Sequence, residues 1–276
     1  MRKIVTLIIL LTAIFTVSAC STDSGFDITS ETEIVVGLEA AYAPFNWATP
    51  TENSFTVPIA NQSGFYADGF DVVMAQEIAD ALGLTLVIRA IEWDGLIPAL
   101  LAGEIDLIIA GMSPTSERAQ TVAFSDPYFQ SEQVMVVRND GDFANATSLT
   151  DFNGARIVAQ LGTLQDDLID QIPGVNHLDA VNDYATLVTS LLNNASDGFV
   201  AELPVAMGIV AANPSLSYIT FTDGNGFSVS AEDVTVSVAL RQEDTALLSA
   251  INEALAAIST ETRNGYMEAA LSRQPQ

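Results

Sequence analysis

Basic residues are scarce in this chain. Lys and Arg total 9 of 276 residues, against 35 Asp and Glu, and the formal net charge at pH 7 is −26. Proteins that bind nucleic acid need a basic surface to neutralise the phosphates, so the composition excludes nucleic acid as a partner. The excess of acidic groups indicates a solvated surface.

Cysteine and histidine are nearly absent. Cys20 is the single cysteine and His177 the single histidine, so the chain can form neither an internal disulfide nor a cysteine-rich or multi-histidine metal site. It also contains no glycine-rich phosphate loop. We therefore expect no metal and no cofactor. We assign no function to His177, which lies in a predicted loop without an evident partner.

The N-terminus resembles a bacterial lipoprotein signal peptide over residues 1–19. A basic start at Met1-Arg2-Lys3 precedes an apolar run from Ile4 to Val17, which is short for a membrane-spanning helix. The ending Val17-Ser18-Ala19-Cys20 resembles a lipobox, in which Cys20 receives a lipid and becomes the mature N-terminus. The alternative is an ordinary secretory signal with an incidental cysteine.

Residues 20–32 are polar and acidic, without an apolar period, and are predicted to form a flexible tether. With a lipid on Cys20, this arrangement places the protein on the extracytoplasmic face of the cell membrane. We expect the surface of a Gram-positive cell.

The rest of the chain indicates two α/β domains. The length favours about two domains, and short apolar runs alternate with helical patterns from Ile34 onward, as in α/β proteins. A second such series starts near Asp140. Strands are expected over 34–38, 85–88, 105–110, 156–160, 198–201 and 234–240, helices over 70–82, 94–101, 162–172, 184–192, 204–211, 244–258 and 265–271, and a turn-rich insertion over 46–67.

Residues 93–128 carry the most informative pattern. A helix ends at a glycine, a buried strand follows, and the strand runs into a loop of small residues that leads to Arg118. With so few basic groups in the chain, an arginine there is a candidate anchor for an anionic ligand group. Its guanidinium presents a fork of donors that matches the two oxygens of a carboxylate. An ion pair with Glu117 or another acid is the alternative.

Together these segments resemble the family-3 bacterial solute-binding proteins, the polar amino-acid receptors of ABC importers. The resemblance covers almost all of residues 33–272. It rests on motifs that occur in the family's order: Val36-Gly37, Tyr42-Ala43-Pro44-Phe45, Gly69-Phe70-Asp71, Trp93-Asp94-Gly95-Leu96-Ile97-Pro98-Ala99-Leu100, Gly103-Glu104-Ile105-Asp106, Ala110-Gly111-Met112-Ser113, Glu117-Arg118, Phe124-Ser125-Asp126-Pro127-Tyr128 and Leu161-Gly162-Thr163.

The resemblance implies an α/β, two-lobed periplasmic-binding-protein-like fold of type 2, with two lobes joined by two hinge strands. Lobe 1 would comprise residues 33–129 and 232–276, and lobe 2 residues 130–231, with crossings near 128–131 and 230–234. The family's proteins close on an amino acid and deliver it to a permease in the membrane. We expect a monomer that works with such a permease.

The resemblance also assigns roles in lobe 1. Arg118 would make a paired contact with the ligand's α-carboxylate, and Gly111, Met112 and Ser113 would present backbone groups and a hydroxyl to the same end of the ligand. The glycine lets the main chain approach closely. Simple turn chemistry is the alternative for Gly111 and Ser113.

Lobe 2 would complete the site from the opposite side. Gly162 and Thr163 open a helix whose free N–H groups favour an anion, although Thr163 could also be a plain helix cap. Glu202 stands where most of the family has aspartate and would accept the α-ammonium.

Three further residues would surround the ligand side chain. Tyr42 and Trp93 match aromatic positions that flank it and suit an aliphatic stem or a cation; the alternative is two core aromatics. Glu39 matches an acidic residue that some members use for polar or basic side chains. A carboxylate enclosed in a cleft needs a partner, which arginine, lysine, histidine or glutamine would supply. The inference fails if Glu39 points to solvent.

Other readings remain open. Asp94 is expected to cap a helix and Asp106 to start a strand, so neither is assigned a function. The leading hypothesis is a binding protein without chemistry. An enzyme on the same fold, such as a cyclohexadienyl or arogenate dehydratase, would need a general acid or base, which Glu39 or Glu202 could supply. A surface adhesin is the third possibility.

Overall fold

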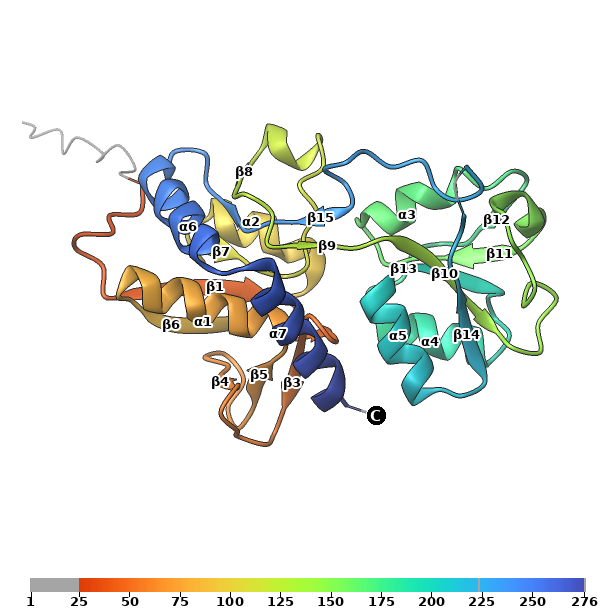
Figure 1. Cartoon of the computed structure of the whole chain (residues 1–276), viewed down its shortest axis with the longest axis horizontal. Coiled ribbons are helices and arrows are strands. Elements are labelled where there is room, and N and C mark those ends of the chain that lie inside the picture. Colours follow the sequence, from red (N-terminus) through yellow and green to blue (C-terminus); the bar gives the residue numbers. More distant parts are fainter. Residues whose placement is uncertain (1–24, 223, 276) are drawn as a thin grey trace, which may run out of the picture.

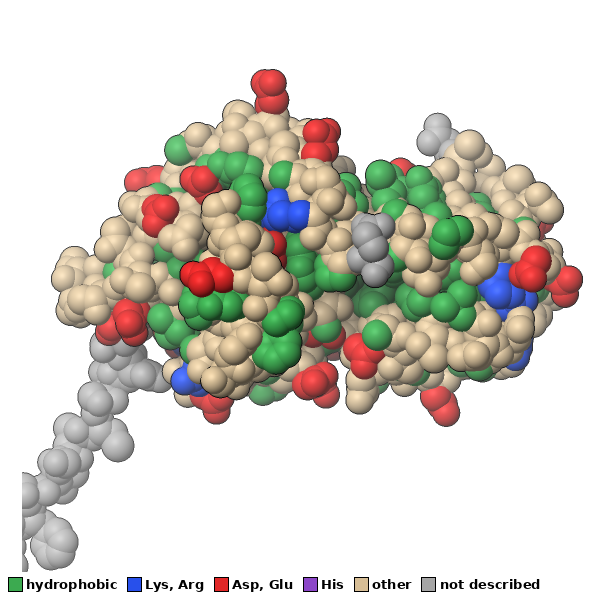
Figure 2. Space-filling view, turned by 90° about the horizontal axis from the view of Figure 1, so that it is seen from below, with side chains coloured by type: hydrophobic (Ala, Val, Ile, Leu, Met, Phe, Trp, Pro, Cys, Tyr) green, Lys and Arg blue, Asp and Glu red, His purple; other side chains and the backbone are tan. Residues whose placement is uncertain are grey.

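The computed structural model describes residues 25–222 and 224–275 and shows two α/β lobes side by side (Figure 1). The predicted signal peptide and Cys20 lie outside the described residues. Within the described part of the chain, no helix is long and apolar enough to cross a membrane. Acidic side chains are spread over both lobes and basic ones are few, as Figure 2 shows for one face.

Lobe 1 is built on a five-stranded sheet in the order β6-β1-β7-β16-β8. Strand β1 pairs in parallel with β6 and β7, while β16 pairs antiparallel with β7 and β8. The strands are β1 (Glu33–Leu38), β6 (Thr85–Ala90), β7 (Leu107–Ile108), β8 (Ala123–Phe124) and β16 (Ala239–Leu240), and the helices are α1 (Phe70–Leu82), α2 (Leu96–Leu101), α6 (Thr245–Ala257) and α7 (Thr260–Arg273).

A second sheet in lobe 1 replaces the expected turn-rich insertion over 46–67, so that prediction was wrong. Four short antiparallel strands form it in the order β2-β3-β5-β4. Strands of two to four residues are too short to show a clear alternation of apolar and polar residues. They are β2 (Ala41–Tyr42), β3 (Asn46–Thr49), β4 (Val57–Pro58) and β5 (Tyr66–Asp68).

Lobe 2 has its own five-stranded sheet in the order β12-β11-β13-β10-β14. All five residues of β13 are buried, as expected for a strand covered on both faces. The elements are β10 (Gln133–Arg138), β11 (Arg156–Val158), β12 (Asn176–His177), β13 (Gly198–Glu202), β14 (Leu216–Ile219), α3 (Leu164–Ile169), α4 (Tyr184–Leu192) and α5 (Leu203–Ala212), and three 3₁₀ turns complete the chain at Trp93–Gly95, Arg118–Gln120 and Leu149–Phe152.

Two antiparallel strands join the lobes. β9 (Phe129–Gln130) pairs with β15 (Thr235–Val236), and these strands run between the lobes in Figure 1. The single strand expected over 234–240 is therefore divided, because its first part pairs in the hinge and its second part, β16, enters the lobe 1 sheet. The prediction of two α/β lobes joined by two hinge strands is confirmed.

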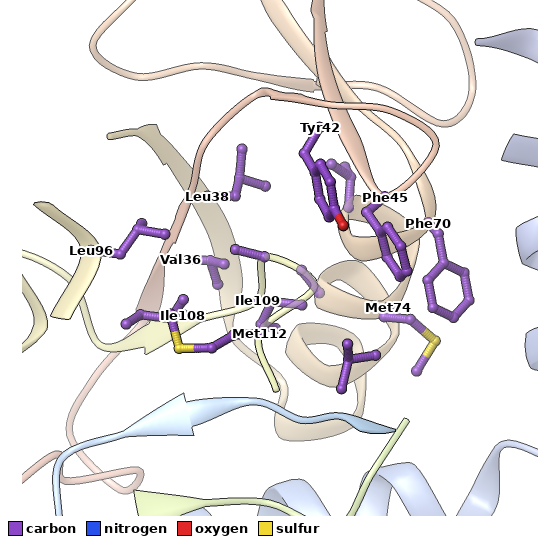
Figure 3. Packing of buried hydrophobic residues seen from close by; sticks show 14 of the residues in the cluster. Val36, Leu38, Tyr42, Phe45, Phe70, Met74, Leu96, Ile108, Ile109 and Met112 are labelled. Atoms are coloured by element: carbon purple, nitrogen blue, oxygen red, sulfur yellow. The ribbon is translucent and has the colours of Figure 1, made fainter. Parts of the chain in front are cut away.

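The hydrophobic core of lobe 1 lies directly beneath the cleft. Val36, Leu38 and Ile108 from the sheet pack with Phe45 and other buried side chains (Figure 3). The loops that follow β1 and β7 rise from this core, so its packing fixes where they begin.

Residues 25–32, which the sequence places in a flexible tether, lie against lobe 1. Phe26 and Ile28 pack on its core, and the Phe26 N–H donates to Asp244 Oδ1 at 2.6 Å. Two apolar residues within a polar stretch carry no recognisable period, which is why the sequence did not indicate this contact.

Candidate functional site

A cavity lies between the lobes. It contains eight of the ten residues predicted to bind ligand, drawn from both lobes and from loops at the ends of sheet strands. Lobe 1 contributes Glu39, Tyr42, Trp93, Gly111, Ser113 and Arg118, and lobe 2 contributes Gln160, Thr163, Leu164, Gln165, Tyr184 and Glu202.

Arg118 projects into this cavity from the 3₁₀ turn that follows the Gly111–Ser113 loop. Its Nη1 donates to the Ser113 carbonyl at 2.9 Å and its Nη2 to the Gly162 carbonyl at 3.2 Å, which uses two of the five N–H donors of a guanidinium. Burial lowers its pKa to about 10, so it stays charged at neutral pH. Among the described residues it forms no ion pair, unlike four other arginines. The alternative pairing with Glu117 is absent.

Gly111 and Ser113 hold the cavity wall beside Arg118. Gly111 has φ of 64°, a left-handed conformation that favours glycine, and a Cβ there would lie 2.9 Å from the Tyr42 ring. The Ser113 hydroxyl donates to the Asp233 carbonyl at 3.0 Å. Its hydrogen is therefore engaged, so the hydroxyl can offer a ligand only an acceptor.

Met112 and Gly162 do not line this cavity. The Met112 side chain is 1 % exposed and lies in the lobe 1 core (Figure 3), and its carbonyl accepts from the Ser237 N–H, so only its backbone could make the predicted contact with ligand. Because it lies between two residues that face the cavity, its side chain points to the opposite side. Gly162 instead bridges the lobes through its carbonyl.

Thr163 caps the short helix α3. Its hydroxyl oxygen accepts from the Asp166 N–H at 3.3 Å and donates to the Gln160 carbonyl at 2.7 Å. The predicted cap is present, and the residue also lines the cavity. Its hydroxyl hydrogen is engaged inside lobe 2, so only an acceptor lone pair of the hydroxyl and the backbone remain available to a ligand.

Two carboxylates face the cavity, that of the half-buried Glu39 and that of the buried Glu202. Glu39 Oε1 accepts from Gln160 Nε2 at 2.8 Å, but Glu39 Oε2 and Glu202 Oε2 have no hydrogen-bond partner among the described residues. Burial is the main cause that raises the pKa of Glu39 to about 7 and that of Glu202 to about 8. Glu39 therefore points into the cleft and not to solvent.

These raised pKa values predict how the stability of the ligand-free protein depends on pH. Both carboxyls bind protons more tightly when folded than when unfolded, where a glutamate titrates near 4.3. Their contribution to the free energy of unfolding is complete below that value and is lost as pH rises through about 7 and 8. Over pH 5 to 9, the wild type should therefore lose stability relative to a Glu39→Gln, Glu202→Gln double variant.

The measurement is the melting temperature of both proteins across this pH range. The other acidic residues are common to the two, so the difference isolates the two carboxyls. A loss of about 1 kcal/mol lowers Tm by about 2–4 °C in domains somewhat smaller than this chain. A difference that does not change with pH would show that these groups titrate normally.

The structure adds residues that the sequence did not indicate. Tyr184, the first residue of α4, contacts Tyr42 across the cleft with ring centroids 4.8 Å apart. Gln160 follows β11 and donates both to Glu39 and to the Asn182 carbonyl. Its place at the carboxyl end of a parallel strand, directly before the Leu161-Gly162-Thr163 motif, was a usable signal; Tyr184 gave none.

Three side-chain hydrogen bonds cross the cleft between the described residues of the two lobes. The Trp93 indole Nε1 donates to the Gly162 carbonyl at 3.0 Å, the same oxygen that accepts from Arg118. The Arg118 guanidinium also lies 5.1 Å from the centre of the Trp93 ring. The third contact is Gln160 with Glu39. Trp93 therefore closes the cleft as well as lining the cavity.

The remaining singled-out residues have structural contacts. Asp94 makes no helix-capping hydrogen bond, contrary to the prediction. Asp106 accepts from the Val35 N–H and pairs with Arg241. His177 is not isolated, since its ring nitrogens lie 2.9 and 3.0 Å from carboxylate oxygens of Asp170 and Asp166. Among the described residues there is no cluster of three or more potential metal ligands.

Comparison with known proteins places this geometry in context. Residues 34–268 match the sequence profile of the bacterial extracellular solute-binding proteins, family 3. A probable histidine-binding protein of Campylobacter jejuni is 32% identical over 83% of this chain and 85% of its own length.

Solved structures agree with this match. An amino acid ABC transporter substrate-binding protein from Streptococcus pneumoniae, bound to L-arginine, superposes with a TM-score of 0.77 at 28% identity, covering 89% of this chain and 96% of its own. Holo ArgBP from T. maritima gives a TM-score of 0.70 at 34% identity, covering 85% and 95%. The predicted type 2 periplasmic-binding-protein fold is therefore confirmed.

Proposed function

The chain belongs to the bacterial extracellular solute-binding proteins of family 3, and we propose that it captures a basic amino acid outside the cytoplasm for an ABC importer. One observation carries the choice of ligand class. A single cavity holds two carboxylates, each with a buried and unpaired oxygen, and one guanidinium that forms no ion pair with any described residue. A molecule with one carboxylate and two cationic or donor groups complements this set.

Each end of such a ligand has a partner in the cavity. Arg118 would pair with the α-carboxylate, and Glu202, reaching in from lobe 2, would accept the α-ammonium. Glu39 would then accept from a cationic or amide side chain. This distribution reads the amino-acid backbone and the side chain with separate residues.

The aromatic rings fit the middle of the ligand. Tyr42 and Tyr184 contact each other on one side of the cavity, and Trp93 lines another part of its wall. Flat π faces stabilise an aliphatic stem and a nearby cation. The relatives named for arginine or histidine support a basic ligand, although glutamine also satisfies Glu39 through its amide.

The mechanism requires only differential affinity. A ligand that contacts both lobes stabilises the closed state over the open one, and the permease complex recognises the loaded receptor. We propose that the chain catalyses no reaction, and the binding-protein relatives support this. Formation of an aromatic product from prephenate or arogenate would overturn that part of the proposal.

We further infer that the protein is a monomer anchored by a lipid on Cys20 at the extracytoplasmic face of a Gram-positive cell membrane. The support is the lipobox-like ending of residues 1–19 and the family's extracellular role. Metabolic labelling with a tagged fatty acid tests the anchor, with Cys20→Ser as the variant that should lose the label.

A thermal-shift panel of the twenty amino acids tests the proposed ligand class. The protein is first unfolded and refolded to remove ligand carried through purification, since bound ligand raises apparent stability. Arginine, lysine or histidine should raise Tm most, and aspartate and glutamate should have no effect. A largest shift from an acidic or purely aliphatic amino acid would refute the assignment.

Glu39→Gln should change the selectivity between cationic and amide side chains more than it changes the affinity for all amino acids. Removal of its charge should weaken binding of a cationic amino acid by about 10- to 100-fold and change the Kd for glutamine by less than about threefold, because an amide side chain can pair with another amide. Isothermal titration with arginine and glutamine gives both constants.

Glu92→Gln is the matched control for this variant. Glu92 is exposed, lies close enough to Glu39 to raise its pKa, and does not line the cavity. The Glu92→Gln variant removes the same charge as Glu39→Gln but leaves the contact between Glu39 and the ligand side chain in place. Equal effects from the two variants would mean that Glu39 acts only through the overall field.

A further inference from the structure

A buried carboxylate outside the cavity connects two loops of the binding site. Asp71 lies in the first turn of α1, is 0 % exposed, and belongs to the Gly69-Phe70-Asp71 motif, which the site itself does not use. Its Oδ1 accepts from the Tyr128 hydroxyl at 2.7 Å and its Oδ2 from Asn46 Nδ2 at 2.8 Å. Both oxygens are therefore engaged by donors.

The backbone holds Asp71 in this place. The Asp71 N–H donates to the Phe45 carbonyl at 2.8 Å, and Gly69 has φ of 134° with its α-carbon so close that a Cβ would overlap the same carbonyl. Any larger residue at position 69 would push α1 away. The motif thus sets the distance between the start of α1 and the loop that contains Asn46.

The Asn46 branch leads to Glu39. Asn46 Oδ1 accepts from the Ala40 N–H at 2.8 Å, which belongs to the peptide that follows Glu39. Ala40 has φ of 57°, a left-handed conformation that costs energy for any residue with a Cβ and persists only where its surroundings enforce it. The Asn46 bond is one of the contacts that enforce it, so it determines where Glu39 points.

The Tyr128 branch leads to Gly111. The Gly111 N–H donates to the Tyr128 hydroxyl oxygen at 3.3 Å. Burial raises the pKa of Asp71 to about 6, and hydrogen bonds from Tyr128, Asn46 and the Gly111 N–H oppose this rise. The Tyr128 N–H donates to the Val236 carbonyl at 2.9 Å, so this branch also contacts the hinge.

We propose that Asp71 is a positioning residue for ligand selection: through Asn46 and Tyr128 it fixes the Glu39–Ala40 peptide and the Gly111 loop, and so sets the preference for a cationic side chain. The assignment of that preference rests on the proposed function. The coupling of Asp71 to the two loops does not, because it follows from the hydrogen bonds alone.

The network depends on the direction of each hydrogen bond. Asp71 must accept twice, because Tyr128 and Asn46 both present hydrogens to it. An asparagine at position 71 would turn one hydrogen toward a donor, and Asn46 could answer only by flipping its amide and losing the Ala40 bond. With aspartate at position 46 and asparagine at position 71, each hydrogen-bond donor in the network again faces an acceptor.

The exchanged pair gives the experiment. D71N, N46D and N46D/D71N are compared with the wild type by two measurements: the ratio of Kd values for glutamine and arginine, and the hydrogen-exchange rate of the Ala40 amide by NMR. We expect D71N to lower the ratio of the glutamine Kd to the arginine Kd by about tenfold. We also expect it to accelerate hydrogen exchange of the Ala40 amide by about tenfold. N46D/D71N should return both to within about threefold of the wild type.

The outcomes separate a positioning role from a general effect on stability. A D71N protein with a lower Tm but unchanged selectivity and exchange overturns the proposal, as does a folded N46D/D71N protein that restores neither. If D71N does not fold, the double variant alone decides by the same criterion. If the wild type binds no amino acid, the proposed function fails, and the exchange rates still test the coupling.

Discussion

Arg118→Ala should abolish measurable binding of every amino acid, whatever its side chain. The guanidinium is the cation of the cavity, and two of its donors are already held in place by the Ser113 and Gly162 carbonyls. A ligand carboxylate enclosed without it would lack its main partner. Removal of one member of a buried, hydrogen-bonded charge pair costs about 2–5 kcal/mol, or a loss in Kd of up to several thousandfold.

Isothermal titration with the wild type's best ligand measures this loss. Arg89→Ala is the matched control, because Arg89 is exposed on β6, does not line the cavity, and its replacement removes the same charge. Arg118→Lys keeps the charge but not the fork, and should recover only part of the affinity. Affinity retained in Arg118→Ala would sink the carboxylate assignment.

Glu202→Gln should weaken all α-amino acids by a similar factor, since the ammonium it would accept is common to them. The expected loss is about 2–5 kcal/mol, or about 30- to several-thousandfold in Kd. Its raised pKa of about 8 adds a second effect. At pH 7 the carboxyl is mainly protonated without ligand and must release its proton to accept an ammonium.

Titrations in buffers of different ionisation enthalpy count the released protons. The wild type should release close to one proton from Glu202 at pH 7, and Glu202→Gln should release markedly less. Glu132→Gln, an exposed residue just before β10, is the control for charge. If Glu202→Gln instead weakened some amino acids and not others, Glu202 would contact the ligand side chain and not the α-ammonium.

Long or capped elements could be predicted from the sequence. Helix α1 has thirteen residues with a regular apolar spacing and ends at Gly83, whose φ is 71°, so its bounds were predicted correctly. The four-stranded sheet of β2 to β5 was not, because strands of two to four residues are too short to show a clear alternation of apolar and polar residues. The division of 234–240 into β15 and β16 depends on the hinge, which is a property of the fold and not of local sequence.

The same distinction applies to the site. Arg118 was singled out because it lies in a family motif in the loop after a predicted strand, and Glu202 because it follows the predicted strand 198–201 at a position where the family has an acidic residue. Gln160 could have been found from its place directly before the Leu161-Gly162-Thr163 motif, whereas Tyr184 could not, since an isolated tyrosine at a helix start carries no pattern. The role of Asp71 was hidden for another reason: it acts through hydrogen-bond directions that depend on four elements meeting in space.

The Gly162 carbonyl has a consequence for the time that a ligand stays bound. It accepts from Trp93 and from Arg118, and with the Gln160–Glu39 bond it closes the cleft over the cavity. A molecule inside cannot leave until these contacts break, so we expect its dissociation to require lobe opening, which its own contacts with both lobes slow further. The time that a ligand stays bound would then depend partly on the receptor's own contacts between the lobes, and separation of Gly162 from Trp93 would shorten it.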